Sequence, residues 1–242
     1  YIMSTNTVFY NGSNSTSVAI SGPLTSTKFP SGYTVSNITR VAIGNTVTSI
    51  GSNAFENTTS LTSVTFEADS LLTSIGNNAF ASSALASIEI PNSVTSIGQQ
   101  AFYQTLALTS FTFEADSSLN SIGENAFQYS ELTSIEIPKS VTSIKSYAFY
   151  QTLALTSFTF EANSSLKTIG VGAFQSSRLT SIVIPEQVTT IGDNAFLSSS
   201  LNEATVNYAK LNDPNFPAGI GSNRTIGGKA GVLIIGYNIP SN

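Results

Sequence analysis

The sequence predicts a β-rich α/β solenoid, in which short repeats stack into one elongated domain. The segment Ala101–Ala115 returns letter for letter at Ala148–Ala162, 47 residues later. The pair Ala-Phe recurs along most of the chain in alternating steps of 25 and 22 residues. A fixed period between about 20 and 50 residues is typical of solenoids and related repeat arrays. Because two step lengths alternate, the 47-residue copy indicates duplication of a pair of repeats.

Two residues of each repeat keep this period. The first is the phenylalanine that follows alanine, at Phe55, Phe80, Phe102, Phe127, Phe149, Phe174 and Phe196. The second is the isoleucine of the run Thr-Ser-Ile or its variants, at Ile50, Ile75, Ile97, Ile122, Ile144, Ile169 and Ile191. One repeat cannot bury its apolar side chains alone, so we expect both sets to line a core shared by neighbouring repeats.

Each repeat has three parts. The first, exemplified by Leu61–Phe66, ends in alternating apolar and polar residues, as in a strand with one buried face. The second is a short strand such as Leu72–Ile75. The third, Gly76–Ser83, is too short and polar for a long helix, so we expect one or two helical or 3₁₀ turns there. Gly76 itself suits a left-handed turn.

Long and short repeats differ after the first strand. The short form turns through proline, as in Ile90–Val94, whereas the long form uses Glu67–Leu72. Proline has no N–H to donate, so it fits the end of a strand and stops the pairing there. After a first strand near Ile38–Ile43, the expected strands are Leu61–Phe66, Leu85–Ile90, Leu108–Phe113, Leu132–Ile137, Leu155–Phe160, Leu179–Ile184 and Leu201–Val206.

The recurring pattern LxxIxIPxSVTSIGxxAF, found between about Ile38 and Val206, resembles the BspA-like leucine-rich repeats of bacteria and protists. The resemblance implies a right-handed superhelix with a parallel β-sheet, and a role in surface display, adhesion and binding to host or neighbouring molecules. That family often has cysteine three residues after the phenylalanine. Here small hydroxyl residues stand instead, which we expect to bond to the backbone: Thr58, Ser83, Thr105, Ser130, Thr152, Ser177 and Ser199.

Outside the repeats we expect two caps. Residues 1–37 lack the repeat and contain two short strand patterns, Thr7–Tyr10 and Ser17–Ile20, so they predict an N-terminal β cap over the first open edge. Residues 38–207 form the predicted solenoid. Residues 208–242, with a last strand near Gly231–Tyr237, predict a C-terminal cap.

Composition excludes several classes of partner. Charged residues make up only 10% of the chain, and the formal net charge is −5, so we expect neither nucleic acid nor insertion into a membrane. Cysteine and histidine are both absent, which excludes a disulfide framework and a Cys/His metal site. The sequence therefore predicts no cofactor and no metal, and no His or Cys is present to act as a catalytic base or nucleophile.

A candidate binding face follows from the alternation along the first strands. In a leucine-rich solenoid these strands lie about 4.8 Å apart, and alternate side chains point outward in columns. The outward residues are serines, threonines and glutamates, and no Lys or Arg occurs between Arg40 and Lys139 although nine acids do. The candidate ligand-binding residues are Ser63, Thr65, Glu67, Ser87, Glu89, Ser110, Thr112, Glu114, Ser134, Glu136, Thr159 and Glu161.

Two hypotheses for the function remain. The first is an extracellular or cell-surface binding module, with a protein as the favoured ligand and a glycan as the alternative. The second is a structural rod within a larger surface protein, whose polar face was copied passively by duplication.

Other features are weaker signals. The turns that carry Glu67 with Asp69 and Glu114 with Asp116 could hold Ca²⁺, but each offers too few oxygens for a dedicated loop. Glu67 and Glu89 form a candidate acid/base pair without a visible pocket, so we expect no enzyme activity. A threonine column on the second strands has the regularity of ice-binding surfaces, but threonine is an ordinary strand residue. Tyr103, Tyr129 and Tyr150 are expected to cover the core rather than to anchor a partner.

Overall fold

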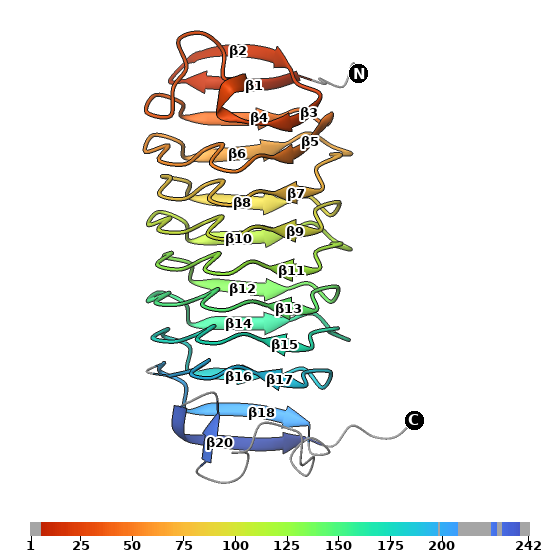
Figure 1. Ribbon diagram of the computed structural model, residues 1–242, viewed down its shortest axis with the longest axis vertical. Coiled ribbons are helices and arrows are strands. Elements are labelled where there is room, and N and C mark those ends of the chain that lie inside the picture. The colour runs from red at the N-terminus through yellow and green to blue at the C-terminus, as the bar shows by residue number, and fades with distance from the viewer. Residues whose placement is uncertain (1–5, 198, 208–223, 227–228, 238–242) are drawn as a thin grey trace.

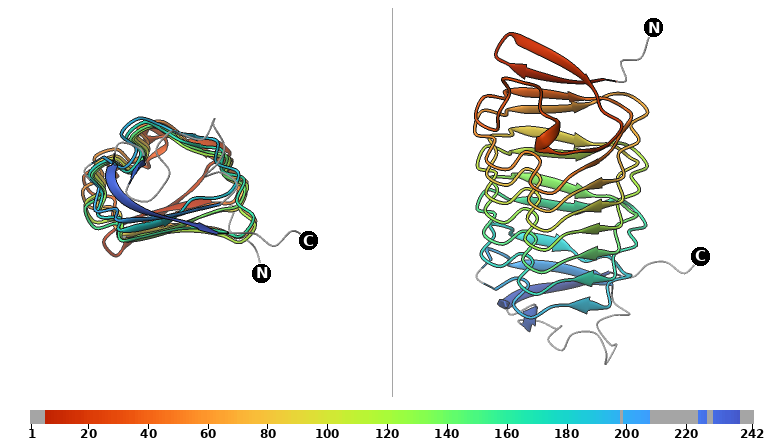
Figure 2. Two further views of the ribbon diagram at one scale, coloured as in Figure 1. Left: turned by 90° about the horizontal axis from the view of Figure 1, so that it is seen from below. Right: turned by 45° about the horizontal axis from the view of Figure 1, so that its top comes forward.

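The computed structural model describes residues 6–197, 199–207, 224–226 and 229–237. The chain winds through flat coils stacked along one axis, and the first and last described strands lie at opposite ends of the stack (Figure 1). Seen along that axis, the coils follow one common outline (Figure 2). Each coil contributes one strand to a second sheet, and all but the last contribute one to a first sheet; in the last, the equivalent strand joins a separate four-stranded sheet, and a wall of turns closes each coil. We number the coils 1 to 7, from β4/β5 to β16/β17.

The first sheet is parallel from β4 to β14 and carries the candidate face on its outer side. Its order is β14-β12-β10-β8-β6-β4-β1-β2. Its strands start two residues later than the sequence predicts and are four residues long within the repeats. The strands are β1 (Asn6–Asn11), β2 (Asn14–Ala19), β4 (Arg40–Ile43), β6 (Ser63–Phe66), β8 (Ser87–Ile90), β10 (Ser110–Phe113), β12 (Ser134–Ile137) and β14 (Ser157–Phe160).

The second sheet is built from the shorter strands. Its order is β17-β15-β13-β11-β9-β7-β5-β3, and its repeat isoleucines pair directly, Ile75 with Ile97 and Ile122 with Ile144. The strands are β3 (Gly22–Leu24), β5 (Val47–Ile50), β7 (Ser74–Ile75), β9 (Ser96–Ile97), β11 (Ser121–Ile122), β13 (Ser143–Ile144), β15 (Thr168–Ile169) and β17 (Thr190–Ile191).

Both sheets begin with strands from outside the repeats. The hairpin β1–β2 pairs antiparallel with β4, and β3 pairs in parallel with β5, so this segment covers the open edge of coil 1. A single 3₁₀ turn, η1 (Ser26–Lys28), follows β3. Phe29 then stacks on Phe55 at a centroid distance of 5.5 Å and extends the core into the N-terminal segment.

At the other end, β16 (Ser181–Val183) pairs with β18 (Glu203–Asn207), and β18 pairs in parallel with β20 (Lys229–Tyr237). The short strand β19 (Arg224–Ile226) runs antiparallel to β20. Most of the predicted C-terminal cap, residues 208–242, lies outside the described residues, so that prediction stays untested.

The repeat phenylalanines form one continuous stack inside the solenoid. From Phe55 to Phe196 the neighbouring rings have centroids 5.1–5.4 Å apart and lie within 9° of parallel. All of these side chains are fully buried. The predicted common interior is therefore confirmed, and each ring is covered by the rings of the coils on either side.

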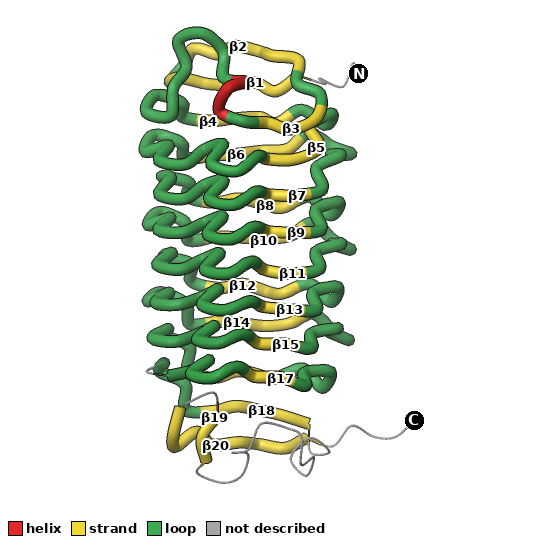
Figure 3. Tube along the Cα trace, in the orientation of Figure 1, coloured by secondary structure: helices red, strands yellow, loops and turns green. Residues whose placement is uncertain are grey.

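The wall of turns corrects one expectation. The predicted helical or 3₁₀ turns after each second strand are wrong: in the described residues the only helical segment is η1, outside the repeats (Figure 3). In coils 1 to 6, the residue before the Ala-Phe pair and the residue two after it adopt a left-handed conformation, as Asn53 (φ 59°) and Asn57 (φ 58°) do in coil 1. Left-handed residues at this spacing interrupt any helix.

Hydrogen bonds between neighbouring coils explain why these residues form turns instead of a helix. The N–H groups of Asn53, Phe55 and Asn57 donate to carbonyls of the next coil, at 2.8–2.9 Å. Those of Ala54, Glu56 and Thr58 instead bond three residues back within their own coil. Every second N–H in the turns thus forms a hydrogen bond to the neighbouring coil. The turns therefore form a third hydrogen-bonded wall beside the two sheets.

The glycine of the Ser-Ile-Gly run also has another role than predicted. Gly76 does not have a positive φ, so it is not a left-handed turn residue. A Cβ added at Gly76 would lie 2.6 Å from the backbone nitrogen of Ser52 in the preceding coil. At Gly123 it would lie 2.3 Å from the carbonyl oxygen of Gly98. At these two glycines the backbones of successive coils approach too closely for a side chain, although in coil 5 the equivalent position is Lys145.

Two kinds of contact alternate between neighbouring coils of the first sheet. Where a short coil precedes a long one, the ladders β4–β6, β8–β10 and β12–β14 each hold four residue pairs. The ladder is then extended by a bond from the N–H of Glu114 to the carbonyl of Ile90, and Glu67 and Glu161 bond in the same way. The 47-residue unit is therefore also a structural unit, a hydrogen-bonded pair of coils.

Where a long coil precedes a short one, the ladder nearly disappears. β6 and β8 share only the pair Ser63–Ser87, and β10 and β12 share only Ser110–Ser134. The equivalent of the glutamate N–H is here a proline, such as Pro91, which cannot donate. We call these contacts, between coils 2 and 3, 4 and 5, and 6 and 7, the proline seams.

The hydroxyl residues that follow the phenylalanines separate into two groups. Thr105 donates from Oγ1 to the carbonyl of Phe102 at 2.8 Å, and Thr58, Thr152 and Ser199 make the same bond. The expected backbone bond is therefore present at these positions. In the long coils, by contrast, the buried hydroxyl of Ser130 has no hydrogen-bond partner within the described part of the chain, and the same holds for Ser83 and Ser177.

This difference predicts opposite effects of removing the hydroxyl. Thr105→Val should lower the free energy of unfolding by about 1 kcal/mol, because it deletes a buried hydrogen bond. Ser130→Ala should leave stability unchanged or raise it, because it deletes a buried hydroxyl that is not bonded. Urea unfolding followed by circular dichroism measures both, and equal losses for the two variants would contradict the assignment.

Candidate functional site

The candidate binding face lies on the outer side of the first sheet, and its residues form columns in register. Ser87 pairs with Ser110, Thr112 with Glu89, and Glu136 with Thr159. Their side chains point away from the core because the intervening residues, such as Phe111 and Ile88, are buried. The structure therefore brings together the serine column and the mixed threonine–glutamate column that the alternation predicts.

Exposure separates the face into an open centre and a tighter edge. The central side chains are exposed, namely Thr65, Ser87, Glu89, Ser110, Thr112, Ser134, Glu136 and Thr159. Ser63, Glu67 and Glu161 are half-buried, and the last two lie where the strands end; Glu114 also lies at a strand end but is exposed. Any partner that approaches this sheet therefore meets hydroxyls and the two carboxylates of Glu89 and Glu136 first.

A groove of about 440 Å³ extends over the strands of coils 2, 3 and 4 and crosses the proline seam between coils 2 and 3. It collects seven of the twelve predicted residues in one place. Its lining consists of Ser63, Val64, Thr65, Phe66, Ser87, Ile88, Glu89, Ser110, Thr112 and Glu114. The groove lies where the ladder between β6 and β8 is reduced to one pair, so the loss of pairing at the seam coincides with the hollow.

A second hollow of about 380 Å³ lies at the seam between coils 6 and 7. It includes the predicted residues Thr159 and Glu161 together with Phe160, Val183 and Pro185. Val183 is 56% exposed, so this hollow is more apolar than the first. Neither hollow is lined by the remaining predicted residues Glu67, Ser134 and Glu136.

Sequence reasoning missed the phenylalanines that end the long-coil strands. Phe66 and Phe160 are half-buried and line the two hollows, and Phe113 occupies the same position in coil 4. In the short coils this position holds a fully buried isoleucine, such as Ile90. The regular Phe/Ile alternation along the copies was the signal that would have identified them.

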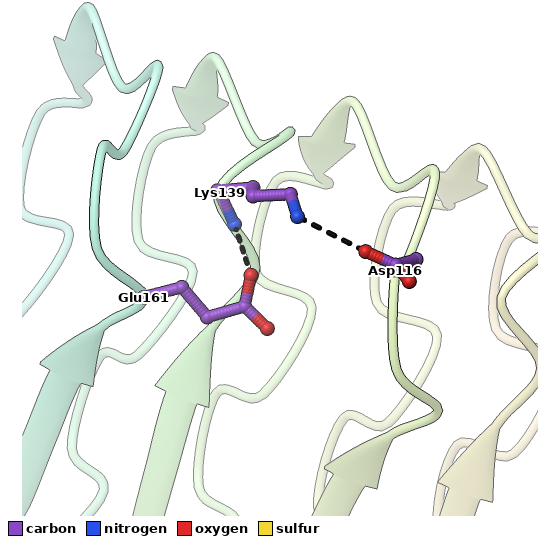
Figure 4. A network of polar contacts seen from close by, with 3 residues as sticks. All are labelled: Asp116, Lys139 and Glu161. Carbon is purple, nitrogen blue, oxygen red and sulfur yellow. Dashed lines mark hydrogen bonds and ion pairs between the residues drawn. The ribbon is translucent and has the colours of Figure 1, made fainter.

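Two of the predicted glutamates also have structural contacts. Glu114 accepts a hydrogen bond from the backbone N–H of Asn92 at 3.0 Å, across the closed contact between coils 3 and 4. Glu161 accepts the equivalent bond from the N–H of Lys139 (Figure 4). These carboxylates therefore hold neighbouring coils together, whatever else they bind.

Lys139 forms a second contact at the same corner. Its Nζ donates to Asp116 at 3.0 Å, across the seam between coils 4 and 5 (Figure 4). The hydrogen bond to Asp116 and the charge of that carboxylate raise the pKa of the Lys139 ammonium, and Glu161 adds to the effect. Both partners are exposed, so this pair contributes little to stability and matters mainly for local charge.

The surplus of acids between residues 41 and 138 does not lie on one surface. Glu89 and Glu136 are on the open face, and Glu114 is at its edge. Glu124 and Glu131 are exposed in the turn wall, away from the first sheet. The face is therefore moderately acidic. Glu124 and Glu131 carry the same charge as Glu89 and Glu136 but lie on the turn wall, so they can serve as controls.

Comparison with known proteins identifies the repeat type. The model of the BspA type leucine rich repeat region matches residues 4–118 and 112–216, with six copies. The chain belongs to this family. No curated protein matches it. The expected resemblance is thus confirmed, whereas the family match by itself names no ligand.

Two solved structures of leucine-rich repeat proteins are similar to this chain in fold. A leucine-rich repeat protein from Bacteroides ovatus is 24% identical over 83% of this chain and 56% of its own, with a TM-score of 0.58. One from Eubacterium ventriosum is 22% identical over 83% of this chain and 72% of its own, with a TM-score of 0.51. The chain thus spans little more than half the length of the first. Similarity at this level shows the fold alone.

The BspA-type architecture accounts for the weaker candidates without a ligand. Asp69 and Asp116, considered for Ca²⁺, have φ of 55° and 56°, and Asn163 replaces them with φ 59°. Aspartate and asparagine are the residues that most readily adopt this left-handed conformation apart from glycine. Among the described residues, no group of three or more Asp, Glu, His or Cys is placed to hold a metal ion.

The threonine column and the tyrosines also have structural contacts. Thr73 donates from its hydroxyl to the carbonyl of Thr48 in the preceding coil at 3.0 Å, and Thr95 does the same to Thr73. Tyr129 packs edge-to-face against Tyr103 and Tyr150, with 5.8 Å between centroids in both pairs. In the described part of the chain, no helix has the length and apolar character needed to span a bilayer.

Proposed function

We propose that this chain is a non-enzymatic binding module that recognises a protein ligand through the outer face of its first sheet, outside the cell or at a cell surface. The observation that carries the proposal is the groove between coils 2 and 3, which gathers seven in-register residues of the predicted face. Membership of the BspA-type family supports the surface role. A glycan remains a possible alternative ligand for a face so rich in hydroxyls.

Repetition favours a protein as the ligand. The same serine recurs on every strand from β6 to β14 and is exposed on β8 to β14, with about 4.8 Å between strands, so the face offers a long surface rather than one enclosed pocket. Long concave or flat surfaces built by repeats are suited to extended macromolecular partners. The carboxylates of Glu89 and Glu136 would lie about 10 Å apart and favour a partner with basic side chains.

A charge-reversal experiment tests this proposal. The double variant Glu89→Lys, Glu136→Lys should lose binding to any member of a panel of immobilised extracellular-matrix proteins that retains the wild type. Binding should also weaken as ionic strength rises, because exposed charge pairs are screened beyond about 8–10 Å. Surface plasmon resonance at two salt concentrations measures both effects.

The matched control is Glu124→Lys, Glu131→Lys, which makes the same change of charge on the turn wall. It should keep its binding, because its residues do not lie on the first sheet. Loss of binding in the control as well as in the double variant would show that net charge, and not this face, attracts the partner.

A structural rod is the second candidate, and the unbroken phenylalanine stack favours it. A rod needs no recognition surface. If the wild type is retained by no panel member, and charge reversal changes no property of a larger protein containing the chain, the rod replaces the binding module.

A further inference from the structure

We propose that the groove between coils 2 and 3 is a lysine pocket, which receives a lysine side chain from an extended basic segment of the partner protein. This inference rests on the proposed function, and it specifies the chemistry of the partner at one place on the face. It is carried by three features of the groove: the half-buried ring of Phe66, an acidic rim, and the absence of an internal cation at this seam.

The ring of Phe66 and the acidic rim match the two parts of a lysine side chain. Phe66 contributes apolar surface because its ring is only half-buried, whereas the side chains of Val64 and Ile88 point into the core. Glu89 and Glu114 contribute carboxylates at the same groove. Lysine lays its four-carbon stem along apolar surface and keeps its ammonium at a polar edge, and the ammonium is also attracted to aromatic rings.

The chain contains a second version of this site, in which its own lysine takes part. Forty-seven residues further on, at the seam between coils 4 and 5, Phe113, Glu136 and Glu161 repeat Phe66, Glu89 and Glu114. There Lys139 places its ammonium 3.0 Å from Asp116 and its backbone N–H on Glu161.

At the seam between coils 2 and 3, the residue equivalent to Lys139 is Asn92. Asn92 keeps the backbone bond, to Glu114, but supplies no positive charge to Asp69, the equivalent of Asp116. No Lys or Arg occurs anywhere between Arg40 and Lys139. The seam between coils 2 and 3 therefore has the same carboxylates as the seam between coils 4 and 5. Because Asn92 replaces Lys139, it lacks the lysine ammonium.

The test uses an acetylated and amidated pentapeptide, Lys-Ser-Lys-Ser-Lys, with Gln-Ser-Gln-Ser-Gln as its neutral counterpart. Isothermal titration calorimetry at low salt should detect binding of the lysine peptide and not of the glutamine peptide. Glu89→Gln should weaken binding about fivefold, the upper range for one exposed charge pair. Glu124→Gln, the matched control on the turn wall, should change it by less than about twofold.

Exchanging the two equivalent residues provides a reciprocal test. Asn92→Lys should weaken peptide binding, because it places a positive charge beside Asp69 and Glu114. Lys139→Asn should raise the stoichiometry from one peptide toward two, because it removes that charge from the second version of the site. Both positions are exposed, so both variants should unfold at the wild-type temperature, which a thermal melt checks.

Three results would overturn the lysine pocket: no binding of the lysine peptide, equal weakening by Glu89→Gln and Glu124→Gln, or no effect of Asn92→Lys. The pocket and the proposed function fail separately. If matrix-protein binding is lost on charge reversal but the peptide does not bind, the pocket is wrong and the protein-binding face stands. If the peptide binds with the expected variant pattern but no matrix protein is retained, the pocket stands and the adhesion role is wrong.

Discussion

Phe127→Ala should lower the free energy of unfolding by about 3–5 kcal/mol, the range for deleting a buried phenylalanine. The ring of Phe127 is fully buried and stacks on Phe102 and Phe149 at 5.3 and 5.1 Å. Phe111 also packs against its edge at 4.8 Å. The neighbouring backbones are fixed by three hydrogen-bonded walls, so we expect the cavity to stay open rather than collapse. A thermal melt should fall by roughly 6–20 °C.

The control for this substitution is Leu106→Ala. Leu106 is 66% exposed, so its truncation removes an apolar side chain without opening the core. It should change stability by no more than about 0.5 kcal/mol. A fall of less than about 2 °C for Phe127→Ala, or equal losses for both variants, would show that Phe127 does not belong to a close-packed stack.

Gly123→Ala should be the second most destabilising single change, at about 3 kcal/mol, because it forces two backbones apart. The new methyl group would lie 2.3 Å from the carbonyl oxygen and 2.5 Å from the carbonyl carbon of Gly98. Neither atom belongs to a flexible side chain that can move aside. Urea unfolding should show a lower midpoint.

Lys145 provides the control, since it occupies the same position in coil 5 and already carries a Cβ. Its side chain is exposed, so Lys145→Ala should be within about 0.5 kcal/mol of the wild type. If Gly123→Ala proves as harmless as Lys145→Ala, close approach of the coils is not what selects glycine here.

The stacked coils and the core could be predicted from the sequence because they depend on periodicity. The recurrence of Ala-Phe fixes which side chains meet, and the phenylalanine stack from Phe55 to Phe196 follows directly from it. The outward columns were predictable for the same reason, because alternate residues of a strand point to opposite sides. That these columns bind a ligand remains a proposal.

The turn wall could not be predicted, because local composition is compatible with either helical turns or alternating turns. The choice depends on hydrogen bonds to the next coil, such as that from the N–H of Phe55 to the carbonyl of Ala79, 24 residues away in sequence. Glycine in the Ser-Ile-Gly run was misread for a similar reason. Glycine is favoured at this position by the close backbone of the neighbouring coil, and not by the backbone conformation of the glycine itself.

At the proline seams, the loss of one backbone N–H has effects on strand pairing that the sequence does not reveal. The sequence predicts that Pro91 ends its strand, but not that the ladder between β6 and β8 would shrink to a single pair. That loss places a groove beside Phe66 and makes the seam the centre of the candidate site. The contact of Glu114 with the N–H of Asn92 was likewise invisible in the sequence, because it joins residues on different coils.

The regular stacking of coils is tested most directly by distances between spin labels. The chain has no cysteine, so a pair of introduced cysteines is labelled selectively. Labels at Ser63 and Ser134 span three strand spacings of the first sheet, and labels at Ser63 and Ser157 span four. The backbone separations of the two pairs should be near 14 and 19 Å. The label-to-label distance measured by pulsed electron paramagnetic resonance should therefore rise by about 4.8 Å from the first pair to the second. Equal distances for the two pairs, or a second pair closer than the first, would contradict the stacked solenoid.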